Sequence, residues 1–477
     1  MARRTKIVAT LGPSTDSPEM LKKLLQAGVD VVRLNFSHGK QQDHLARAER
    51  VREAAAALGL HIGILADLQG PKIRIESFAG GPVELVEGQT FTLDTALGAD
   101  AGDQHVVGCA YADLPRDVAP GDTLLLNDGA ISMKVEQVEG TRVISTVLLG
   151  GTLSNRKGIN KQGGGLSAAA LTDKDRDDLR FAVQMGVDFI AVSFPRSARD
   201  MMEARELVKA AGGDCLLVAK IERAEALEEL VELVAASDVV MVARGDLGVE
   251  IGDAELPGWQ KRIIREAREQ NRMVITATQM MESMITSPVP TRAEVLDVAN
   301  AVMDGTDAVM LSAETAAGKY PLKVVEAMSR VCIGAESATP DRSNRFRRRM
   351  DEHFERTDEA IARATAWTAR NMHAKAILSL TESGSTALMM SRNDLDLPIY
   401  ALTRHEKTRR RMALCRGVYP VDFTPTQLDT LAPLKEAIAH MLSRGRIALG
   451  DRVILTKGDF TGPGGTNAMK IVTVGEF

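Results

Sequence analysis

Short apolar runs rich in Val and Ile alternate with amphipathic segments over the first 340 residues of the chain. This alternation is typical of parallel βα units, in which each buried strand is followed by a helix. Eight runs can be counted, and they span residues 6–12, 31–36, 62–68, 189–194, 216–222, 239–246, 273–280 and 308–315. Eight units predict a closed (β/α)8 TIM barrel, although an open doubly wound sheet has the same periodicity.

The pattern changes between the third and fourth runs. Residues 82–94, 122–140 and 141–151 alternate polar with apolar side chains around Gly-rich turns, which predicts antiparallel hairpins. From about residue 341 a second α/β alternation begins. We therefore predict a catalytic barrel (1–70 and 168–340), an inserted small β-barrel lid domain (71–167) and a C-terminal α/β regulatory domain (341–477). The alternative for the insertion is a purely structural role.

Composition narrows the class of protein. The formal net charge is −5, from 59 Lys and Arg against 64 Asp and Glu, which gives no sign of a nucleic-acid footprint. The four cysteines show no CxxC spacing, which argues against a zinc ribbon or disulfide framework and fits a reducing compartment. No run approaches the length of a membrane span, and the start of the chain does not read as a signal peptide. We expect a cytoplasmic protein without nucleic-acid or membrane partners.

The segments AKIER and VARGDLGVE carry the strongest chemical signal. Lys220 and Glu222 stand two apart on one strand and so point to the same side. Asp246 ends the next strand. Two carboxylates from neighbouring strand ends suit Mg²⁺ or Mn²⁺, with Lys220 as a mobile charge for an anion. The alternative is a buried ion pair inside the barrel.

Further polar residues stand at the ends of other runs. They are Arg33, Asn35, Ser37 and His38 after the second run, Asp67 and Arg74 after the third, Thr278 at the seventh, and Ser312 and Glu314 at the eighth. Each alone could be a cap, but together they predict a pocket for a small, highly anionic substrate. Phosphoryl transfer needs such positioning and charge neutralisation. No Walker loop is present to hold nucleotide phosphates.

The chain resembles the pyruvate kinase family. The resemblance rests on RTKIVATLGP, RLNFSHG, DLQGPKIR, KIER, ARGDLG, ATQMMESM, PTRAE and MLSAETAAGKYP, which follow one another in the family's order, and on LTESGSTA and RGVYPV in the last domain. It implies transfer of the phosphoryl group of phosphoenolpyruvate to ADP, giving pyruvate and ATP, the last step of glycolysis.

The resemblance also implies roles for individual residues. Glu222 and Asp246 match divalent-metal ligands, and Lys220 and Arg33 match groups that hold the transferring phosphoryl. Gly245 and Asp246, with Thr278, would bind the substrate carboxylate and position the enolate, with Ser312 relaying a proton through water. The positions that match nucleotide contacts are Asn35, Phe36, Ser37, His38, Arg74 and Lys157.

One position departs from the animal and yeast pattern. Many family members use K⁺ near a glutamate that follows the third strand, and here Lys72 stands at that position, after Leu68. A tethered ammonium can replace a free monovalent cation without a binding cost in translational entropy. We therefore predict a K⁺-independent enzyme, although Asn35, Ser37 and Asp67 still match K⁺ ligands.

Regulation is expected in the last domain. Thr381, Ser383, Gly384, Ser385 and Thr386 form a strand-to-helix loop whose hydroxyl and N–H groups could bind an effector phosphate, or could simply cap the helix. The segment resembles the bacterial form activated by AMP or sugar monophosphates. Glu382 inside the loop disfavours a doubly charged bisphosphate. The family also suggests a homotetramer.

Two other functions remain open from sequence. A metal-dependent aldolase or lyase acting on pyruvate or phosphoenolpyruvate would use a similar barrel, and a Schiff-base aldolase would use Lys220 as nucleophile without a metal. A metabolite sensor built on an inactive barrel is the third reading. The complete set of Lys220, Glu222, Asp246 and Thr278 argues against it.

Overall fold

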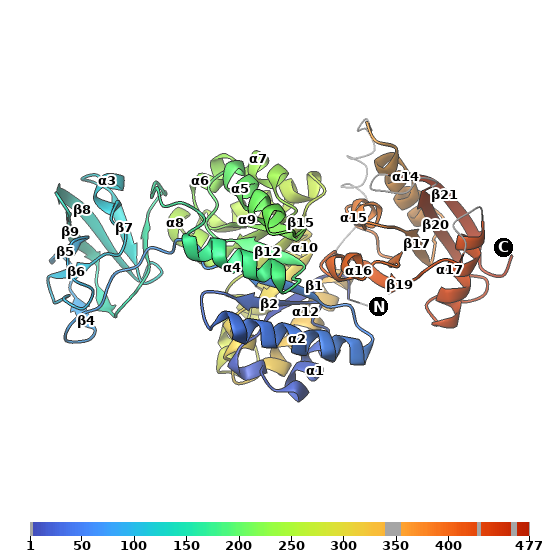
Figure 1. The fold of residues 1–477 in the computed structure, drawn as a ribbon, viewed down its shortest axis with the longest axis horizontal. Helices are drawn as coiled ribbons and strands as arrows, with labels where there is room; N and C mark the ends of the chain where they lie inside the picture. The colour runs from blue at the N-terminus through green and yellow to red at the C-terminus, as the bar shows by residue number, and fades with distance from the viewer. Residues whose placement is uncertain (1–2, 339–353, 427–430, 459–464, 477) are drawn as a thin grey trace. The chain divides into compact units, whose positions relative to one another are not determined.

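The computed structural model describes residues 3–338, 354–426, 431–458 and 465–476 (Figure 1). Eight parallel strands close into a barrel, with β1 paired to both β2 and β16. The barrel strands are β1 (Lys6–Thr10), β2 (Val31–Asn35), β3 (Gly63–Asp67), β12 (Phe189–Val192), β13 (Leu216–Ile221), β14 (Val239–Ala243), β15 (Met273–Ala277) and β16 (Ala308–Leu311). The eight predicted strands and the closed barrel are confirmed, and the open-sheet alternative is excluded.

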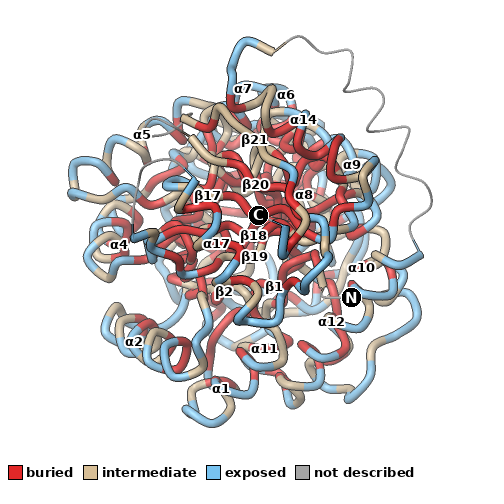
Figure 2. Tube along the Cα trace, turned by 90° about the vertical axis from the view of Figure 1, so that its right-hand side faces the viewer, coloured by how far each residue is buried: buried red, intermediate tan, exposed pale blue. Residues whose placement is uncertain are grey.

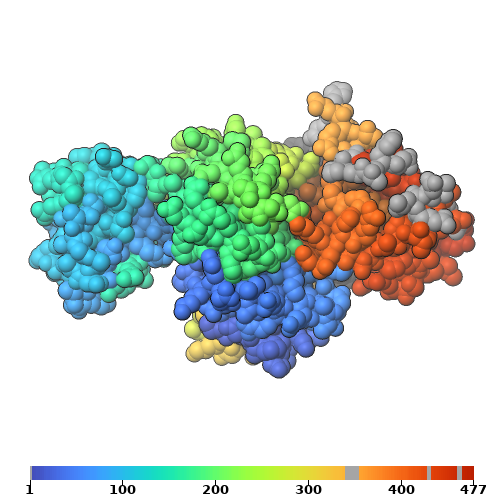
Figure 3. Space-filling model, viewed as in Figure 1, coloured from blue at the N-terminus to red at the C-terminus, as the bar shows by residue number. Residues whose placement is uncertain are grey.

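Helices follow the barrel strands as the alternation predicts. They are α1 (Pro18–Ala27), α2 (Gln41–Leu58), α4 (Asp173–Gln184), α5 (Ala198–Ala210), α6 (Glu225–Glu228), α7 (Leu230–Ala236), α8 (Arg244–Ile251), α9 (Leu256–Glu269), α10 (Arg292–Asp304), α11 (Ala313–Ala316) and α12 (Pro321–Ala338), with short 3-10 turns at Pro13–Thr15 and Glu282–Ile285. Figure 1 shows α1 and α2 on the outside of the barrel near β2, and the corresponding blue part of the chain lies at the surface in Figure 3.

Local signals in the sequence set the ends of α1. The Ser17 hydroxyl accepts a hydrogen bond from Met20 N, and Pro18 occupies the first helical position, where no N–H is needed. Gly28 ends the helix in the left-handed region, at φ 111°. Leu21, Leu24 and Leu25 form the buried face between these ends.

The chain divides into two compact units. Unit 1 comprises residues 1–66, 185–189 and 267–477, and unit 2 comprises residues 67–184 and 190–266. This division differs in kind from the three domains expected from sequence, whose boundaries stay a prediction. The boundary at 340/341 lies outside the described residues.

Unit 2 contains a separate curled sheet inserted after β3. Its six strands are β5 (Thr90–Asp94), β6 (Val106–Gly108), β7 (Thr123–Leu126), β8 (Ile131–Glu139), β9 (Arg142–Leu149) and β11 (Ile159–Lys161), beside a two-stranded sheet of β4 (Val83–Leu85) and β10 (Gly151–Leu153) and a short helix α3 (Leu114–Asp117). This sheet has its own hydrophobic core, which includes Phe91, Leu93, Leu124, Ile131 and Val143.

One hairpin expected from sequence is wrong. Residues 82–94 do not fold back on themselves, because β4 pairs with β10, whereas β5 pairs with β9 and β6. The two hairpins expected over residues 122–151, β7–β8 and β8–β9, are present. A local alternation pattern marks the strands but does not choose between near and distant partners.

The C-terminal part of unit 1 is a five-stranded sheet in the order β19-β18-β17-β20-β21. Its elements are α14 (Thr357–Asn371), β17 (Ala376–Leu380), α15 (Ser385–Ser391), β18 (Ile399–Thr403), α16 (Glu406–Met412), β19 (Val418–Asp422), α17 (Ala432–Ser443), β20 (Arg452–Gly458) and β21 (Thr466–Thr473). Figure 2 shows β1 and the central strands β17, β18 and β20 in the colour of buried residues. Among the described residues, no helix is long and apolar enough to cross a membrane.

Candidate active site

Lys220 lies at the carboxyl end of β13, where unit 2 gathers several polar side chains. Its Nζ is 2.9 Å from Glu222 Oε1 and 3.3 Å from Asp67 Oδ1. It also donates a 2.7 Å hydrogen bond to Ser193 Oγ. The Asp67 and Glu222 side chains are almost completely buried, whereas Lys220 keeps 12% of its side chain exposed. The ammonium is therefore held by three oxygens and still reaches solvent.

Glu222 is fixed on its other side by the backbone. Its Oε2 accepts a 2.8 Å hydrogen bond from Phe194 N, and Phe194 adopts a left-handed conformation with φ 56°. The pKa of Glu222 is raised to about 7, because burial and the negative charge of Asp246 together outweigh the opposing effect of the Lys220 ammonium. A cation beside this carboxylate would restore its ionised form.

Asp246 lies in the first turn of α8, rather than at the end of β14 as expected from sequence. Its Oδ1 is 3.0 Å from Lys72 Nζ, and Lys72 lies 3.4 Å from Asp128 Oδ1 as well. Burial lowers the pKa of Lys72, but the charges of Asp246 and Asp128 outweigh burial and leave that pKa above its ordinary value. Lys72 is therefore a stable ammonium next to a predicted metal ligand.

The donor set of this cluster fits a magnesium-type ion. Within the described ranges, no three His, Cys, Asp or Glu side chains form a group that could hold a metal by themselves. Glu222 and Asp246 supply two carboxylates, and the charge of Asp246 raises the pKa of Glu222. Mg²⁺ is commonly held by one or two carboxylates, with water and substrate phosphate completing its shell, so two carboxylates suffice.

Unit 1 carries the remaining predicted substrate residues. Arg33, at the middle of β2, donates a 3.1 Å hydrogen bond to Thr10 Oγ1. Asn35 is the last residue of β2, and its side chain accepts a 3.1 Å hydrogen bond from Ser37 N. The Phe36 ring stacks on the buried His44 ring at 4.3 Å, and His44 Nε2 lies 3.0 Å from His38 O. His44 of α2 therefore holds the segment from Asn35 to His38 in place.

Thr278 and Ser312 follow β15 and β16. Thr278 has φ 68°, which is strained for a β-branched residue, and its hydroxyl donates to Ala277 O at 2.6 Å. Ser312 N donates a 2.6 Å hydrogen bond to Glu314 Oε2, and Met281 N donates to Glu314 Oε1 at 3.3 Å. Glu314 is buried, which raises its pKa. One carboxylate therefore ties these two loops together.

The predicted nucleotide residues of unit 2 lie on the connections to its curled sheet. Arg74 donates from Nη1 to Arg156 O at 3.0 Å, and Lys157 O accepts from Ile75 N at 2.9 Å. Arg74 and Lys157 are half-buried. The two connections thus run side by side and hold these basic residues close in the fold.

The predicted effector loop joins β17 to α15. Gly384 N donates to Thr381 Oγ1 at 2.9 Å, and Ser383 Oγ donates to Ser385 Oγ at 3.2 Å. Thr386 is buried, and its hydroxyl lies 2.7 Å from Thr466 Oγ1, so it faces inward. Glu382 contacts His405 and Arg404.

Sequence reasoning missed Ser193 and the role of Asp67 as a partner of Lys220. Ser193 directly follows β12, and its hydroxyl also donates to Leu68 O at 2.7 Å. A hydroxyl at a strand end was the available signal, but no neighbouring motif distinguished it from an ordinary buried serine.

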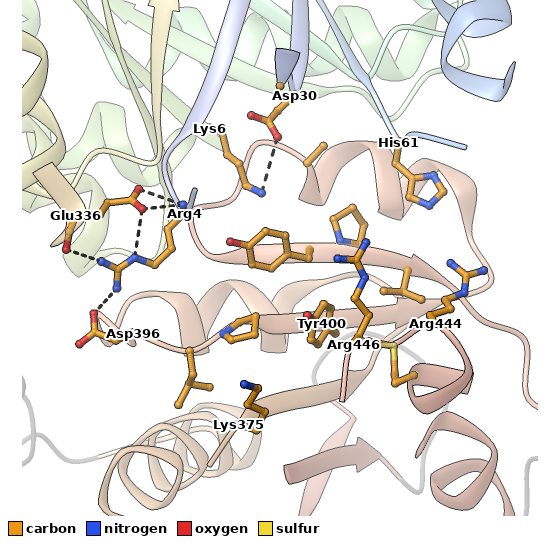
Figure 4. A pocket seen from close by; sticks show the side chains of 18 of the residues that line it. Arg4, Lys6, Asp30, His61, Glu336, Lys375, Asp396, Tyr400, Arg444 and Arg446 are labelled. Atoms are coloured by element: carbon orange, nitrogen blue, oxygen red, sulfur yellow. Dashed lines mark hydrogen bonds and ion pairs between the residues drawn. The ribbon is translucent and has the colours of Figure 1, made fainter. Parts of the chain in front are cut away.

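A cavity of about 1250 Å³ occurs elsewhere in unit 1 (Figure 4). Arg4, Lys6, Glu336, Tyr400 and Tyr419 are among the residues that line it, and Arg4 pairs there with Glu336 and Asp396. None of the predicted site residues lines this cavity. This cavity is therefore separate from the predicted site residues.

Comparisons with known proteins bear on the whole chain. The family model described as "Pyruvate kinase, barrel domain" matches residues 2–325, and "Pyruvate kinase, alpha/beta domain" matches residues 359–472. The chain belongs to the pyruvate kinase family. Pyruvate kinase II of Salmonella typhimurium is 55% identical over 477 residues, covering 99% of both chains. A pyruvate kinase of Haemophilus influenzae is 53% identical and covers 96% of both chains.

A solved structure agrees with the sequence matches. The crystal structure of a pyruvate kinase from Cryptosporidium parvum superposes with a TM-score of 0.91 at 35% identity, covering 99% of this chain and 96% of that one. Membership in the pyruvate kinase family makes the chain a phosphotransferase of EC class 2.7.1.40. The matches give no support to the aldolase or lyase alternative.

Proposed function

We propose that this phosphotransferase catalyses phosphoryl transfer from phosphoenolpyruvate to ADP at the cluster of Lys220, Glu222 and Asp246. Mg²⁺ or Mn²⁺ is the divalent ion that the reaction uses. The observation that carries the proposal is the placement of Lys220 Nζ, 2.9 Å from Glu222 Oε1 and beside the fixed oxygens of Asp67 and Ser193. These contacts pre-organise a positive charge at a barrel strand end, where barrel enzymes keep their chemistry.

Each residue then has a defined task. A divalent ion held by Glu222 and Asp246 would neutralise charge on the phosphoryl oxygens. Lys220 and Arg33 hold the same phosphoryl through charge-assisted hydrogen bonds. Gly245 and Asp246, in the first turn of α8, present backbone N–H groups to the substrate carboxylate.

Thr278 and Ser312 serve the proton transfer that converts the enolate to pyruvate, with water as the carrier. The strained backbone of Thr278 fixes the direction of its hydroxyl. The nucleotide is contacted by Asn35, Phe36, Ser37, His38, Arg74 and Lys157.

A coupled assay with phosphoenolpyruvate, ADP and Mg²⁺ tests the assignment. Lys220→Met should lower kcat by roughly 10²- to 10³-fold, because a group that stabilises charge in the transition state is lost. Calorimetry should still detect phosphoenolpyruvate binding. Lys209→Met makes the same chemical change at an exposed position of α5 and should leave kcat unchanged.

Wild-type turnover that survives EDTA, or a Lys220→Met enzyme as fast as wild type, would contradict the site assignment. Borohydride trapping of pyruvate on Lys220 would instead favour the Schiff-base reading.

We further propose that Lys72 makes the enzyme independent of K⁺. Its Nζ lies between Asp246 and Asp128, at 3.0 and 3.4 Å, and so places a monovalent positive charge beside the predicted metal ligand. Replacing Na⁺ by K⁺ at constant ionic strength should therefore leave the wild-type rate unchanged. Lys72→Glu should depend on K⁺, because the tethered charge is gone while Asn35, Ser37, Asp67 and Leu68 remain.

A many-fold rise of the wild-type rate with K⁺ would refute this proposal. Lys134→Glu reverses an exposed charge on β8 and controls for a general change of surface potential.

Regulation and assembly complete the proposal. A phosphorylated metabolite, such as AMP or a sugar monophosphate, activates the enzyme at the loop of Thr381, Ser383, Gly384, Ser385 and Thr386. Glu382 disfavours a bisphosphate there. The enzyme works as a homotetramer in the cytoplasm, with the barrel, inserted lid and C-terminal regulatory domain divided as expected from sequence.

A further inference from the structure

Glu250 lies one helical turn after Asp246 on α8 and is almost fully buried. Residues four apart share one helix face, so Glu250 and Asp246 are carried by the same short rigid element. The assigned chemistry makes no use of Glu250. A buried carboxylate in that position needs partners, because burying an unpaired charge is costly.

Its partners come from two other segments of unit 2. Oε2 accepts a 2.9 Å hydrogen bond from Ala224 N, just after the Lys220 and Glu222 pair. Oε1 accepts a 3.3 Å hydrogen bond from Asn160 Nδ2 on β11. The backbone O of Glu250 accepts a further 2.9 Å hydrogen bond from Gly163 N. A single residue thus joins the helix of Asp246, the segment after β13, and the chain returning from the curled sheet.

That returning chain, residues 159–168, is here named the second connection. Gly165 N donates to Glu225 Oε1 at 2.7 Å, and Arg223 donates to Leu166 O. At its start, β11 pairs with β7 of the curled sheet. The second connection is therefore bonded to the sheet at one end and to the barrel segments at the other.

A small cavity lies where Glu250 and the second connection meet residues 71–73, which lead from β3 into the curled sheet. It has a volume of about 20 Å³ and is lined by residues that include Lys72, Asn160, Phe194 and Glu250. Such a space holds about one water molecule.

We propose that Glu250 is a positioning residue that holds the second connection, and with it Lys157, in register with the helix of Asp246. Lys157 lies three residues before Asn160 and is bonded to Ile75 through its backbone O. The proposal rests on the assignment of Lys157 to the nucleotide and Asp246 to the metal. Its consequence is that Glu250 serves the ADP side of the reaction more than the phosphoenolpyruvate side.

The electrostatics of Glu250 support a role beyond stability. Its pKa is raised to about 7, because burial and the negative charge of Glu225 together outweigh the opposing effects of Arg223 and the two hydrogen-bond donors. A neutral, well-packed residue would cost less at this position.

The first test is Glu250→Gln, which is nearly isosteric. The Gln oxygen can still accept from Ala224 N, but an NH₂ group replaces the oxygen that accepts from Asn160, so this contact survives only if the Asn160 amide turns over. We expect kcat/KM for ADP to fall roughly 10- to 100-fold, as for other partners that orient site groups. The dissociation constant of phosphoenolpyruvate, measured by calorimetry, should stay within about twofold of wild type.

Restoring the hydrogen bond with its roles reversed tests the mechanism. In Glu250→Gln/Asn160→Asp, the Gln NH₂ group can donate to the new carboxylate, and we expect kcat/KM for ADP to recover at least half of the loss on a logarithmic scale. Asn160→Ala should reproduce the ADP defect from the other side, and serves if Glu250→Gln does not fold. Glu232→Gln, at an exposed position of α7, is the matched control.

The proposal is overturned if folded Glu250→Gln and Asn160→Ala keep wild-type ADP kinetics. Equal losses for ADP and phosphoenolpyruvate with no recovery in the double variant would also overturn it, because a purely structural role gives that pattern. If the wild-type protein shows no turnover, the proposed function has failed, and that result is separate from any comparison of variants.

Discussion

Asp307 and Arg392 form an ion pair in which both side chains are almost completely buried. Asp307 precedes β16, and Arg392 caps the end of α15 in the C-terminal part of unit 1. The Asp307 carboxylate also accepts hydrogen bonds from Val274 N at 2.9 Å and Arg416 N at 3.0 Å. This one carboxylate therefore connects two barrel strands to two segments of the C-terminal part.

Removing one charge of this pair should be strongly destabilising. Asp307→Asn leaves the Arg392 guanidinium buried without its counter-charge, so we expect the free energy of unfolding to fall by about 3–5 kcal/mol. Urea unfolding followed by circular dichroism measures the change. The double variant Asp307→Asn/Arg392→Met should recover part of the loss, and a single variant as stable as wild type would show that the pair contributes nothing.

The pair also predicts the direction of acid destabilisation. The charges of Arg392 and Arg268, with the hydrogen bonds from Arg392 and Arg416, outweigh burial and hold the pKa of Asp307 below its ordinary value. A lowered pKa gives stability that is fully present above the ordinary aspartate pKa of about 3.9 and is lost as pH falls through the lower folded value. The stability difference between wild type and Asp307→Asn should accordingly shrink below about pH 4.

At the scale of elements, the start of α15 depends on one glycine. Gly384 has φ 86°, and a Cβ at this position would lie 2.5 Å from Met412 Sδ on α16. No L side chain fits this backbone without strain. The left-handed backbone and the nearby Met412 side chain therefore both favour Gly in the loop predicted to bind the effector.

Gly384→Ala should lower the free energy of unfolding by more than the roughly 1–2 kcal/mol that a left-handed conformation alone costs an L residue. Gly445→Ala is the matched control, because Gly445 also has positive φ, 63°, but no atom lies within 4 Å of its added Cβ. The Tm of each variant is measured by thermal unfolding. The Gly445 variant reports the cost of the left-handed backbone alone, and the Gly384 variant reports that cost together with the collision with Met412. Equal shifts in Tm would show that Met412 simply moves aside.

At the scale of the molecule, the sequence predicted the barrel strands better than their partners. All eight runs form strands because each is a continuous apolar segment, a local property. The pairing of β1 with β16 decides between a barrel and an open sheet. The hairpin predicted over residues 82–94 was wrong because β4 pairs with β10. Both pairings join segments that are far apart in the sequence, and the local periodicity of apolar residues does not predict such pairings.

The same limit applies to the candidate site. Lys220 and Glu222 could be foreseen as neighbours because strand alternation places them on one side, and they do lie in contact. Ser193 and Glu250 were not foreseen as partners, since Ser193 meets Lys220 from the neighbouring strand β12 and Glu250 meets Asn160 from the inserted sheet. Their roles follow from tertiary placement and not from spacing.

Closure of the barrel by its first and last strands has a consequence during synthesis on the ribosome. Lys6 of β1 is in register with Ala308 of β16, so one edge of β1 has no partner until most of the chain has been translated. At about 5–20 residues per second, that edge waits roughly 15–60 s. The nascent polypeptide thus carries an apolar strand with an unpaired edge for much of its production, and unpaired strand edges are prone to pair with other chains.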